Sequence, residues 1–241
     1  MGHDPDKGGE RGLRIHQLVA RQLGVAILSG EFAPGDPFPG EIEQSAALGV
    51  SRTAYREAIR ILTAKGLLES RPKAGTRVLS RSRWNMLDPD ILSWMFSRTP
   101  HERFVRDLFE LRSIVEPAAA ALAAERRKAA QLDVMRDALA QMAASDFGQV
   151  AWQSADRTFH DALLRAADNE AIASLSSSIG AAVQWTTHFK QRLPRNPRDP
   201  LDDHVAVFTA VEAADTNAAR QAMADLVQLA LADMMLEELD R

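Results

Sequence analysis

The sequence predicts a mainly α-helical protein in two parts: an N-terminal part that ends in a β-hairpin and a C-terminal all-α antiparallel helical bundle. Apolar residues recur at helical spacing through most of the 241 residues. Two short segments typical of strands flank a turn at Gly75. The sequence contains no βαβ alternation, glycine-rich phosphate loop or nucleophile elbow, so a nucleotide-binding enzyme fold is not expected.

The composition excludes several classes of protein. Hydrophobic residues make up 46% and charged residues 26% of the chain, as in a globular protein with room for two domains. The absence of cysteine excludes disulfides, thiolate zinc sites and cysteine nucleophiles. No run of about 18 apolar residues and no secretory leader pattern occur, so we expect a cytoplasmic protein without a membrane partner.

Charge is distributed unevenly along the chain. Residues 11–83 hold 12 Lys and Arg against 6 Asp and Glu, a net charge of +6, whereas residues 84–241 carry −8. A basic part joined to an acidic one is the pattern expected when only one of them meets a polyanion such as nucleic acid. Solvated basic faces are common, so the asymmetry alone does not decide the function.

The N-terminal part is predicted to hold a disordered tail over 1–12 and a domain over 13–80. Its elements, in order, are a helix over 13–28, an extended loop over 32–39, a short helix over 41–48, a helix from Ser51 to about Lys65, and strands over 67–70 and 76–79. This order is that of a winged helix-turn-helix, which inserts its second short helix into the major groove of DNA.

The helix after Ser51 is the candidate reading helix. Arg52 and Arg56 are four residues apart, so they share one face near its N-terminus. The arginine fork matches guanine O6 and N7, while the Ser51 and Thr53 hydroxyls can hold phosphates. The alternative is an ordinary amphipathic helix with solvated arginines. The hairpin favours the first interpretation, because Arg71, Lys73 and Arg77 flank Gly75 in a basic tip suited to phosphates or the minor groove.

Five motifs stand out in this part. They are Gly30-Glu-Phe-Ala-Pro-Gly-Asp36, Phe38-Pro-Gly-Glu41, Gly49-Val-Ser-Arg-Thr-Ala-Tyr-Arg-Glu-Ala-Ile-Arg60, Lys65-Gly-Leu-Leu68 and Gly75-Thr-Arg-Val78. Together they resemble the DNA-binding domain of GntR-family bacterial transcription regulators. The resemblance implies that Ser51, Arg52, Thr53, Arg56 and Gly75 contact operator DNA. The chain departs from many members at Ile42, where they carry a DNA-contacting arginine.

The C-terminal part begins with a linker over 81–100 that contains one short helix, started by Asp88 or Pro89. An all-helical domain is predicted over 101–240, with helices over about 101–128, 129–144, 148–167, 169–191, 201–214 and 216–239. Pro117 is expected to kink or split the first of these helices.

Three polar residues interrupt the apolar pattern of these helices. Asp156 and His160 have i,i+4 spacing, so they can chelate one cation from one helix face, and His204 could supply a third ligand. The alternative for the first two is a surface Asp–His hydrogen bond. His188 is expected to be a partly exposed structural histidine.

The segments Arg112-Ser-Ile-Val-Glu-Pro117, Asp156-Arg-Thr-Phe-His160 and Asp203-His204 are similar to motifs of the FCD domain, the all-helical effector domain of FadR-type GntR regulators. The resemblance implies a divalent metal, zinc or a similar ion, on Asp156, His160 and His204. A fourth histidine of many members falls at Leu226, so this ligand set is incomplete.

Arg112 matches an arginine that commonly meets the carboxylate of a small organic-acid effector in this subfamily. A guanidinium that faces a cavity needs an anion, and a carboxylate satisfies it bidentately. The alternative partner is Glu116, four residues later on the same face. The linker segment over 84–94 resembles that of galactonate-operon-type repressors, which implies a sugar acid such as an aldonate as effector.

The expected function is therefore a homodimeric transcription repressor, not an enzyme, in which the acid shifts the dimer between DNA-competent and incompetent spacing. A dimer is expected because two half-sites must combine their binding energies. The alternative is a metal-dependent hydrolase or isomerase on Asp156, His160 and His204. It would need a general base, and no second carboxylate of matching spacing is evident. A helical scaffold without ligands would leave the basic hairpin unexplained.

Overall fold

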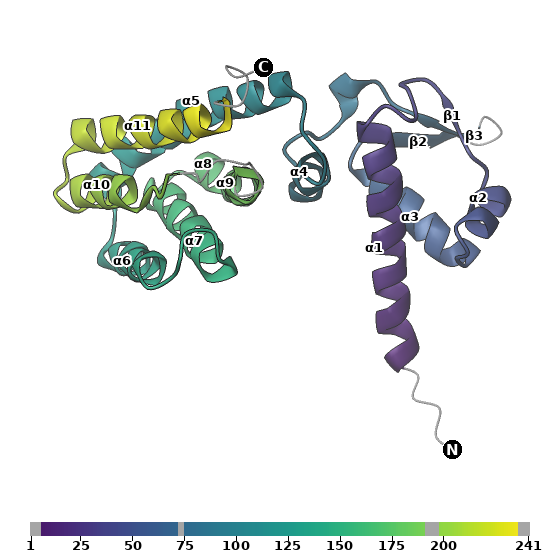
Figure 1. The fold of residues 1–241 in the computed structure, drawn as a ribbon, viewed down its shortest axis with the longest axis horizontal. Coiled ribbons are helices and arrows are strands. Elements are labelled where there is room, and N and C mark those ends of the chain that lie inside the picture. The colour runs from purple at the N-terminus through teal and green to yellow at the C-terminus, as the bar shows by residue number, and fades with distance from the viewer. Residues whose placement is uncertain (1–5, 72–74, 191–197, 236–241) are drawn as a thin grey trace. The chain divides into compact units, whose positions relative to one another are not determined.

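The computed structural model describes residues 6–71, 75–190 and 198–235, with side chains from residue 15 onward. The chain forms two compact units that divide between Arg98 and Thr99 (Figure 1). Within the described ranges, every helix is too short or too polar to cross a membrane.

Three helices build the core of the first unit. They are α1 (Asp6–Leu28), α2 (Glu41–Ala47) and α3 (Arg52–Ala64). α1 packs against α3, and its buried residues Val19, Leu23 and Ile27 recur every four positions. On α3, Tyr55 is buried and its hydroxyl donates to the Pro39 carbonyl at 3.0 Å, which fixes the loop ahead of α2. The apolar face of α3 is thus occupied by the core, and its polar face points outward.

α1 begins earlier than the sequence pattern indicated. Residues 6–12 were expected in a disordered tail, but they are helical. A helix extends one residue at a time from a formed segment at low cost, so it can continue through poor helix formers such as glycine. Residues 1–5 lie outside the described part of the chain.

A small antiparallel sheet completes the winged helix-turn-helix. Its strands are β1 (Pro37–Phe38), β2 (Leu68–Arg71) and β3 (Gly75–Val78), in the order β1-β3-β2. Leu68 pairs with Val78 and both are buried, so the register places the apolar residues of the hairpin on the core side. β1 was expected as loop. β1 has only two residues. It is a strand because it pairs with β3, and no local sequence pattern indicates it.

Two glycines in this unit have the same left-handed backbone but different surroundings. Gly49, in the turn between α2 and α3, has φ +64° and open space where a Cβ would lie. Gly66, which ends α3, has φ +75°, and a Cβ there would overlap the Arg83 carbonyl oxygen.

Alanine at these two positions is therefore expected to have unequal effects. Gly49→Ala should cost about 1–2 kcal/mol of unfolding free energy, from the left-handed conformation alone. Gly66→Ala should cost clearly more, because the carbonyl must also move. Chemical denaturation of both variants measures the difference, and equal losses would contradict it.

The last helix of the first unit, α4 (Pro89–Phe96), begins where the sequence predicted. Asp88 caps it by accepting from the Asp90 and Ile91 N–H groups, and Pro89 occupies its first turn. Lys65 Nζ lies 2.7 Å from carboxylate oxygens of both Asp88 and Asp90, so α4 is tied to the end of α3. A short 3₁₀ turn, η1 (Arg81–Arg83), precedes it.

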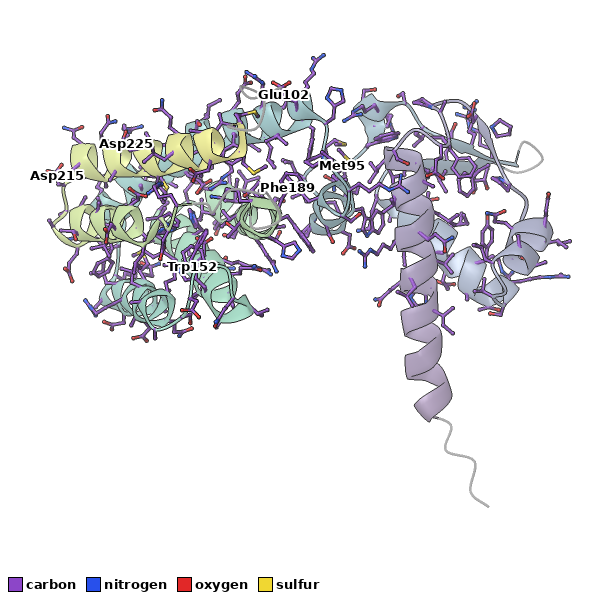
Figure 2. The ribbon with its side chains drawn as sticks, in the orientation of Figure 1. Met95, Glu102, Trp152, Phe189, Asp215 and Asp225 are labelled. Carbon is purple, nitrogen blue, oxygen red and sulfur yellow. The ribbon has the colours of Figure 1, made fainter. Side chains whose placement is uncertain are left out.

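The second unit is all-helical in the part that the structure describes, as predicted. Its helices are α5 (Glu102–Arg126), α6 (Ala129–Ala143), α7 (Val150–Ala166), α8 (Glu170–Ser174), α9 (Ser176–Lys190), α10 (Leu201–Glu212) and α11 (Thr216–Met235). α5 and α11 run side by side, and α7 packs against α5, α6 and α9 (Figure 1). Trp152 of α7 is fully buried among these helices (Figure 2).

Two helix boundaries in this unit differ from expectation. Pro117 was expected to kink or split the first helix. A split is wrong, because α5 continues through Pro117. An interior proline costs about 3 kcal/mol, but α5 buries an alanine-rich face beyond Pro117 that keeps the helix packed. The single helix expected over 169–191 is divided at Leu175, whose N–H bonds the Ile172 carbonyl in a tight turn between α8 and α9.

Candidate nucleic-acid interface and metal centre

The N-terminus of α3 presents an accessible polar face. Arg52, Thr53 and Arg56 are all exposed. Ser51 is the N-cap: its Oγ accepts the Ala54 N–H at 3.1 Å, which leaves the hydroxyl hydrogen free to donate. The unpaired N–H groups and the helix dipole also favour an anion at this end. The fold thus brings the predicted base-reading and phosphate-binding groups to one exposed helix end.

Two residues at the start of α2, Glu41 and Ile42, affect the predicted DNA-binding face of α3. Glu41 Oε2 lies 3.7 Å from Arg56 Nε. Arg56 is exposed and Glu41 is half-buried, so water weakens the pair and the arginine can exchange partners. Ile42 is 67% exposed. Nothing within the described fold explains an apolar side chain at this position.

The β2–β3 hairpin, called the wing below, carries two arginines around one carboxylate. Arg77 Nε donates to Glu69 Oε1, and Arg71 lies 3.2 Å from Glu69 Oε2. The hydrogen bond from Arg77 and the charges of both arginines hold the pKa of Glu69 below its usual value. Gly75 has φ +77° where the hairpin closes. Lys73, the other predicted wing contact, lies outside the described residues.

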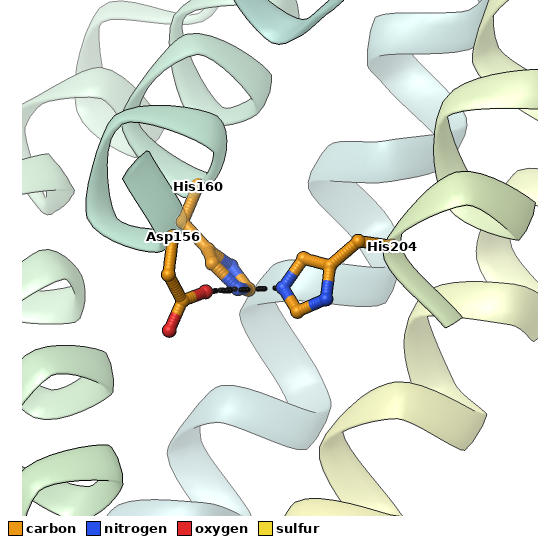
Figure 3. A group of neighbouring side chains, drawn as sticks. All are labelled: Asp156, His160 and His204. Atoms are coloured by element: carbon orange, nitrogen blue, oxygen red, sulfur yellow. Dashed lines mark hydrogen bonds and ion pairs between the residues drawn. The ribbon is translucent and has the colours of Figure 1, made fainter. Parts of the chain in front are cut away.

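Asp156 and His160 of α7 meet His204 of α10 in the interior of the second unit (Figure 3). All three are buried, so the alternative of a surface Asp–His pair is wrong. Asp156 Oδ1 lies 3.0 Å from His204 Nε2 and 3.4 Å from His160 Nε2. One ligand atom from each residue lies within 4.8 Å of the others.

Glu116 of α5 joins this cluster to Arg112. Its Oε1 accepts from Arg112 Nε at 2.6 Å, and its Oε2 lies 2.6 Å from His160 Nδ1. Both Glu116 and Arg112 are buried. Glu116 is therefore the partner of Arg112 in this structure. The sequence indicated no second carboxylate beside Asp156, His160 and His204. That expectation is wrong, because Glu116 lies beside them on another helix, α5.

The charges of the cluster stabilise one another despite burial. Burial alone would raise the pKa of the two carboxyl groups, but their cationic neighbours outweigh it. Arg112 and His160 lower the pKa of Glu116 to about 2, and His160 and His204 hold that of Asp156 well below its usual value. Burial alone would lower the pKa of His160, but Glu116 and Asp156 raise it to about 9.

Acceptor oxygens lie at both nitrogens of each imidazole. His204 Nδ1 lies 2.7 Å from the Pro200 carbonyl, an acceptor only, so this nitrogen carries a proton. Its Nε2 faces the Asp156 carboxylate, again an acceptor. His160 likewise has a carboxylate at each nitrogen. A divalent metal held by Asp156, His160 and His204 would suit this arrangement.

The residues present fit a divalent metal of the zinc type. Zinc takes imidazole nitrogen and carboxylate oxygen, and outer partners such as Pro200 and Glu116 fix the tautomer of its histidine ligands. The adjoining cavity has a volume of about 20 Å³, room for about one water molecule or one ion. Leu226, where the resemblance places a fourth histidine, lines this cavity and supplies no ligand.

The raised pKa of His160 predicts a pH dependence for the metal-free protein. Its folded pKa of about 9 exceeds the ordinary 6.5, so its stabilising contribution is complete below pH 6.5 and is lost as pH rises through 9. Unfolding free energy in chelator is expected to fall over this range, and His160→Gln to flatten the fall. A slope that is the same in both proteins would contradict this assignment.

Known families match both units. Residues 16–78 match the family described as bacterial regulatory proteins, gntR family, and residues 107–229 match the FCD domain. Together these matches span the winged helix-turn-helix and most of the helical bundle.

Relatives of similar length match along most of the chain. The galactonate operon transcriptional repressor of Escherichia coli is 35% identical over 85% of this chain and 90% of its own. The HTH-type transcriptional regulator YieP of the same organism is 34% identical over 89% and 93%. A solved structure of Lar from Listeria monocytogenes has a TM-score of 0.60 with 18% identity, over 90% of this chain and 95% of its own. This last likeness concerns the fold.

Proposed function

This chain belongs to the GntR family of bacterial regulatory proteins and carries an FCD domain, and on that premise we propose a repressor whose affinity for operator DNA is controlled by a small organic acid. Family membership makes it a transcriptional regulator of the GntR/FCD type. The proposal concerns which residues bind the DNA, what the acid is, and what a metal contributes.

The observation that carries the proposal is the exposed polar end of α3. Arg52 and Arg56 would read base edges in the major groove, with Ser51 and Thr53 on phosphates. Arg71, Lys73 and Gly75 of the wing would follow the adjacent backbone. A gel shift at fixed salt, on DNA from upstream of the protein's own gene, tests this. Binding no tighter than to scrambled DNA of equal length would refute it.

A homodimer on a palindromic operator is part of the proposal. One short helix reads few base pairs, so useful affinity needs two half-sites about one helical turn apart. Sedimentation of the protein with and without operator DNA measures the stoichiometry, and two chains per operator are expected.

The proposed effector is a sugar acid such as an aldonate, with its carboxylate on Arg112. The relative whose name refers to a galactonate operon supports this class. Arg112 is buried and lines the cavity beside Asp156. Because the cavity holds about 20 Å³, an acid must displace some of the residues that line it, which gives bound and free forms different shapes. Thermal-shift screening of aldonates, uronates and dicarboxylates, with and without chelator, tests the class.

We propose that Asp156, His160 and His204 hold a divalent metal, which when bound would act as a Lewis acid toward effector oxygens. Zinc at 100 times its dissociation constant should raise the Tm of chelator-stripped protein by about 5–10 °C. Asp156→Asn should abolish the shift. Asp161→Asn is the matched control, because this aspartate sits on the same helix but pairs with Arg165 outside the cluster. Equal shifts in both variants would refute the site.

The alternative of a metal-dependent hydrolase or isomerase has less support. Glu116 is the carboxylate beside the trio, but its pKa of about 2 and its bond to Arg112 make it a weak base at neutral pH. The named relatives are transcriptional regulators. Turnover of sugar acids by the metal-loaded protein would favour the enzyme over the regulator.

A further inference from the structure

Lys190 is a buried cation whose ion pair among the described residues is long. It ends α9, and its side chain is only 3% exposed. Its ion pair is with Asp233 of α11, but Nζ and Oδ2 are 3.7 Å apart, too far for a hydrogen bond. That oxygen is itself buried and has no hydrogen-bond partner among the described residues. An ammonium group offers three donors, and burying them without acceptors is costly.

Lys190 and Arg112 line the same small cavity. Asp156, Thr187 and His204 line it as well. Burial lowers the pKa of Lys190, Asp233 and Asp156 oppose that effect, and the charge of Arg112 adds to it. Two like charges that face one water-poor cavity repel each other unless oxygen acceptors or an anion lie between them. Glu116 accepts from the Nε of Arg112 at 2.6 Å, whereas the ion pair that Lys190 forms within the described residues is longer, at 3.7 Å.

We propose that Lys190 is a second anchor for the acid held by Arg112, and that this acid carries hydroxyl oxygens along its chain in addition to its carboxylate. This inference rests on the proposed function, in which the cavity binds a small organic acid. Arg112 takes the carboxylate, and Lys190 donates to a hydroxyl oxygen farther along the molecule. A site built to bond a hydroxyl strongly rejects the analogue that lacks it, because its own buried donors would stay unpaired.

A matched pair of ligands tests this on the full-length protein. Calorimetric titration with six-carbon aldonates, gluconate and galactonate, is compared with hexanoate, which has the same length and no hydroxyl groups. The wild-type protein should bind an aldonate at least about 100-fold more tightly than hexanoate. Lys190→Met should weaken aldonate binding by about 10- to 100-fold and leave hexanoate binding unchanged.

Two further variants separate this role from a purely structural one. Asp233→Asn should strengthen aldonate binding, because it removes the carboxylate that competes for the ammonium. Lys128→Met is the matched control, since Lys128 forms a similarly long pair, 3.8 Å to Asp168, on the exposed surface. The Tm and operator affinity of each variant without ligand show that it is folded.

The outcomes distinguish the role of Lys190 from the proposed class of effector. Aldonate binding that is equal in wild type and Lys190→Met, or hexanoate bound as tightly as an aldonate, overturns the role of Lys190 alone. Loss of binding in both Lys190→Met and Asp233→Asn, with equal falls in Tm, also overturns it. A wild-type protein that binds none of these acids, and whose operator affinity none of them changes, overturns the proposed effector class together with the role of Lys190.

Discussion

Replacing Arg52 and Arg56 together with alanine is expected to abolish specific binding to the operator. Each arginine that reads a base edge contributes about 1–3 kcal/mol, so the double variant loses about 2–6 kcal/mol per half-site, at least about 30-fold in affinity. Both side chains are exposed, so the fold should persist. Competition gel shifts at fixed salt, with operator and scrambled DNA, measure the loss.

The control for this variant is an arginine of equal exposure elsewhere. Arg165 of α7 is 60% exposed, as is Arg56, and it pairs with Asp161. Arg165→Ala removes the same charge from the second unit and should leave operator affinity unchanged. If the double variant bound operator and scrambled DNA with wild-type affinities, α3 would not be the reading helix. A uniform loss on both DNAs would instead assign these arginines to phosphates.

Replacing Glu116 with alanine is expected to destabilise the second unit more than any other single change proposed for this protein. It removes the carboxylate that lies 2.6 Å from both Arg112 Nε and His160 Nδ1, and leaves two buried cations without it. Breaking a buried ion pair by removing one partner costs about 3–5 kcal/mol. Chemical denaturation in chelator at pH 7 measures the loss.

Glu212→Ala provides the comparison for Glu116. Glu212 also pairs with an arginine, Arg136 at 3.0 Å, but both side chains are about half exposed. Water replaces this pair readily, so the variant should denature as the wild-type protein does. If Glu116→Ala proved equally harmless, water must enter the cluster, and the close packing around Arg112 and His160 would be wrong.

Local signals in the sequence were sufficient for most elements of the fold. Ser51 caps α3, Asp88 caps α4, and Gly66 ends α3, as their residue types predict. Each of these depends on contacts within a few residues along the chain. Pro117 is the counter-example, since packing along the rest of α5 outweighs its local preference to break a helix.

Local sequence signals predicted less of the candidate site in the second unit. The i,i+4 spacing of Asp156 and His160 indicates a shared face, but it gives no information about burial. Glu116 and Lys190 reach the cavity from α5 and α9, and no spacing within one helix relates them to α7. The apolar residues around Glu116 could have signalled its burial, because a charged residue in such surroundings needs a partner, but Lys190 lies in a mostly polar stretch of sequence that gives no such signal.

By itself the sequence determined the order of helices and strands, the polar face of α3 and the resemblance to a GntR regulator with an FCD domain. It did so because helix caps, turns and periodicity act over one or two turns of chain. Only the tertiary structure decided that Arg112 pairs with Glu116, that Glu116 also reaches His160, and that Lys190 faces their cavity. Those contacts depend on how separate helices rotate and pack against one another, which no local pattern specifies.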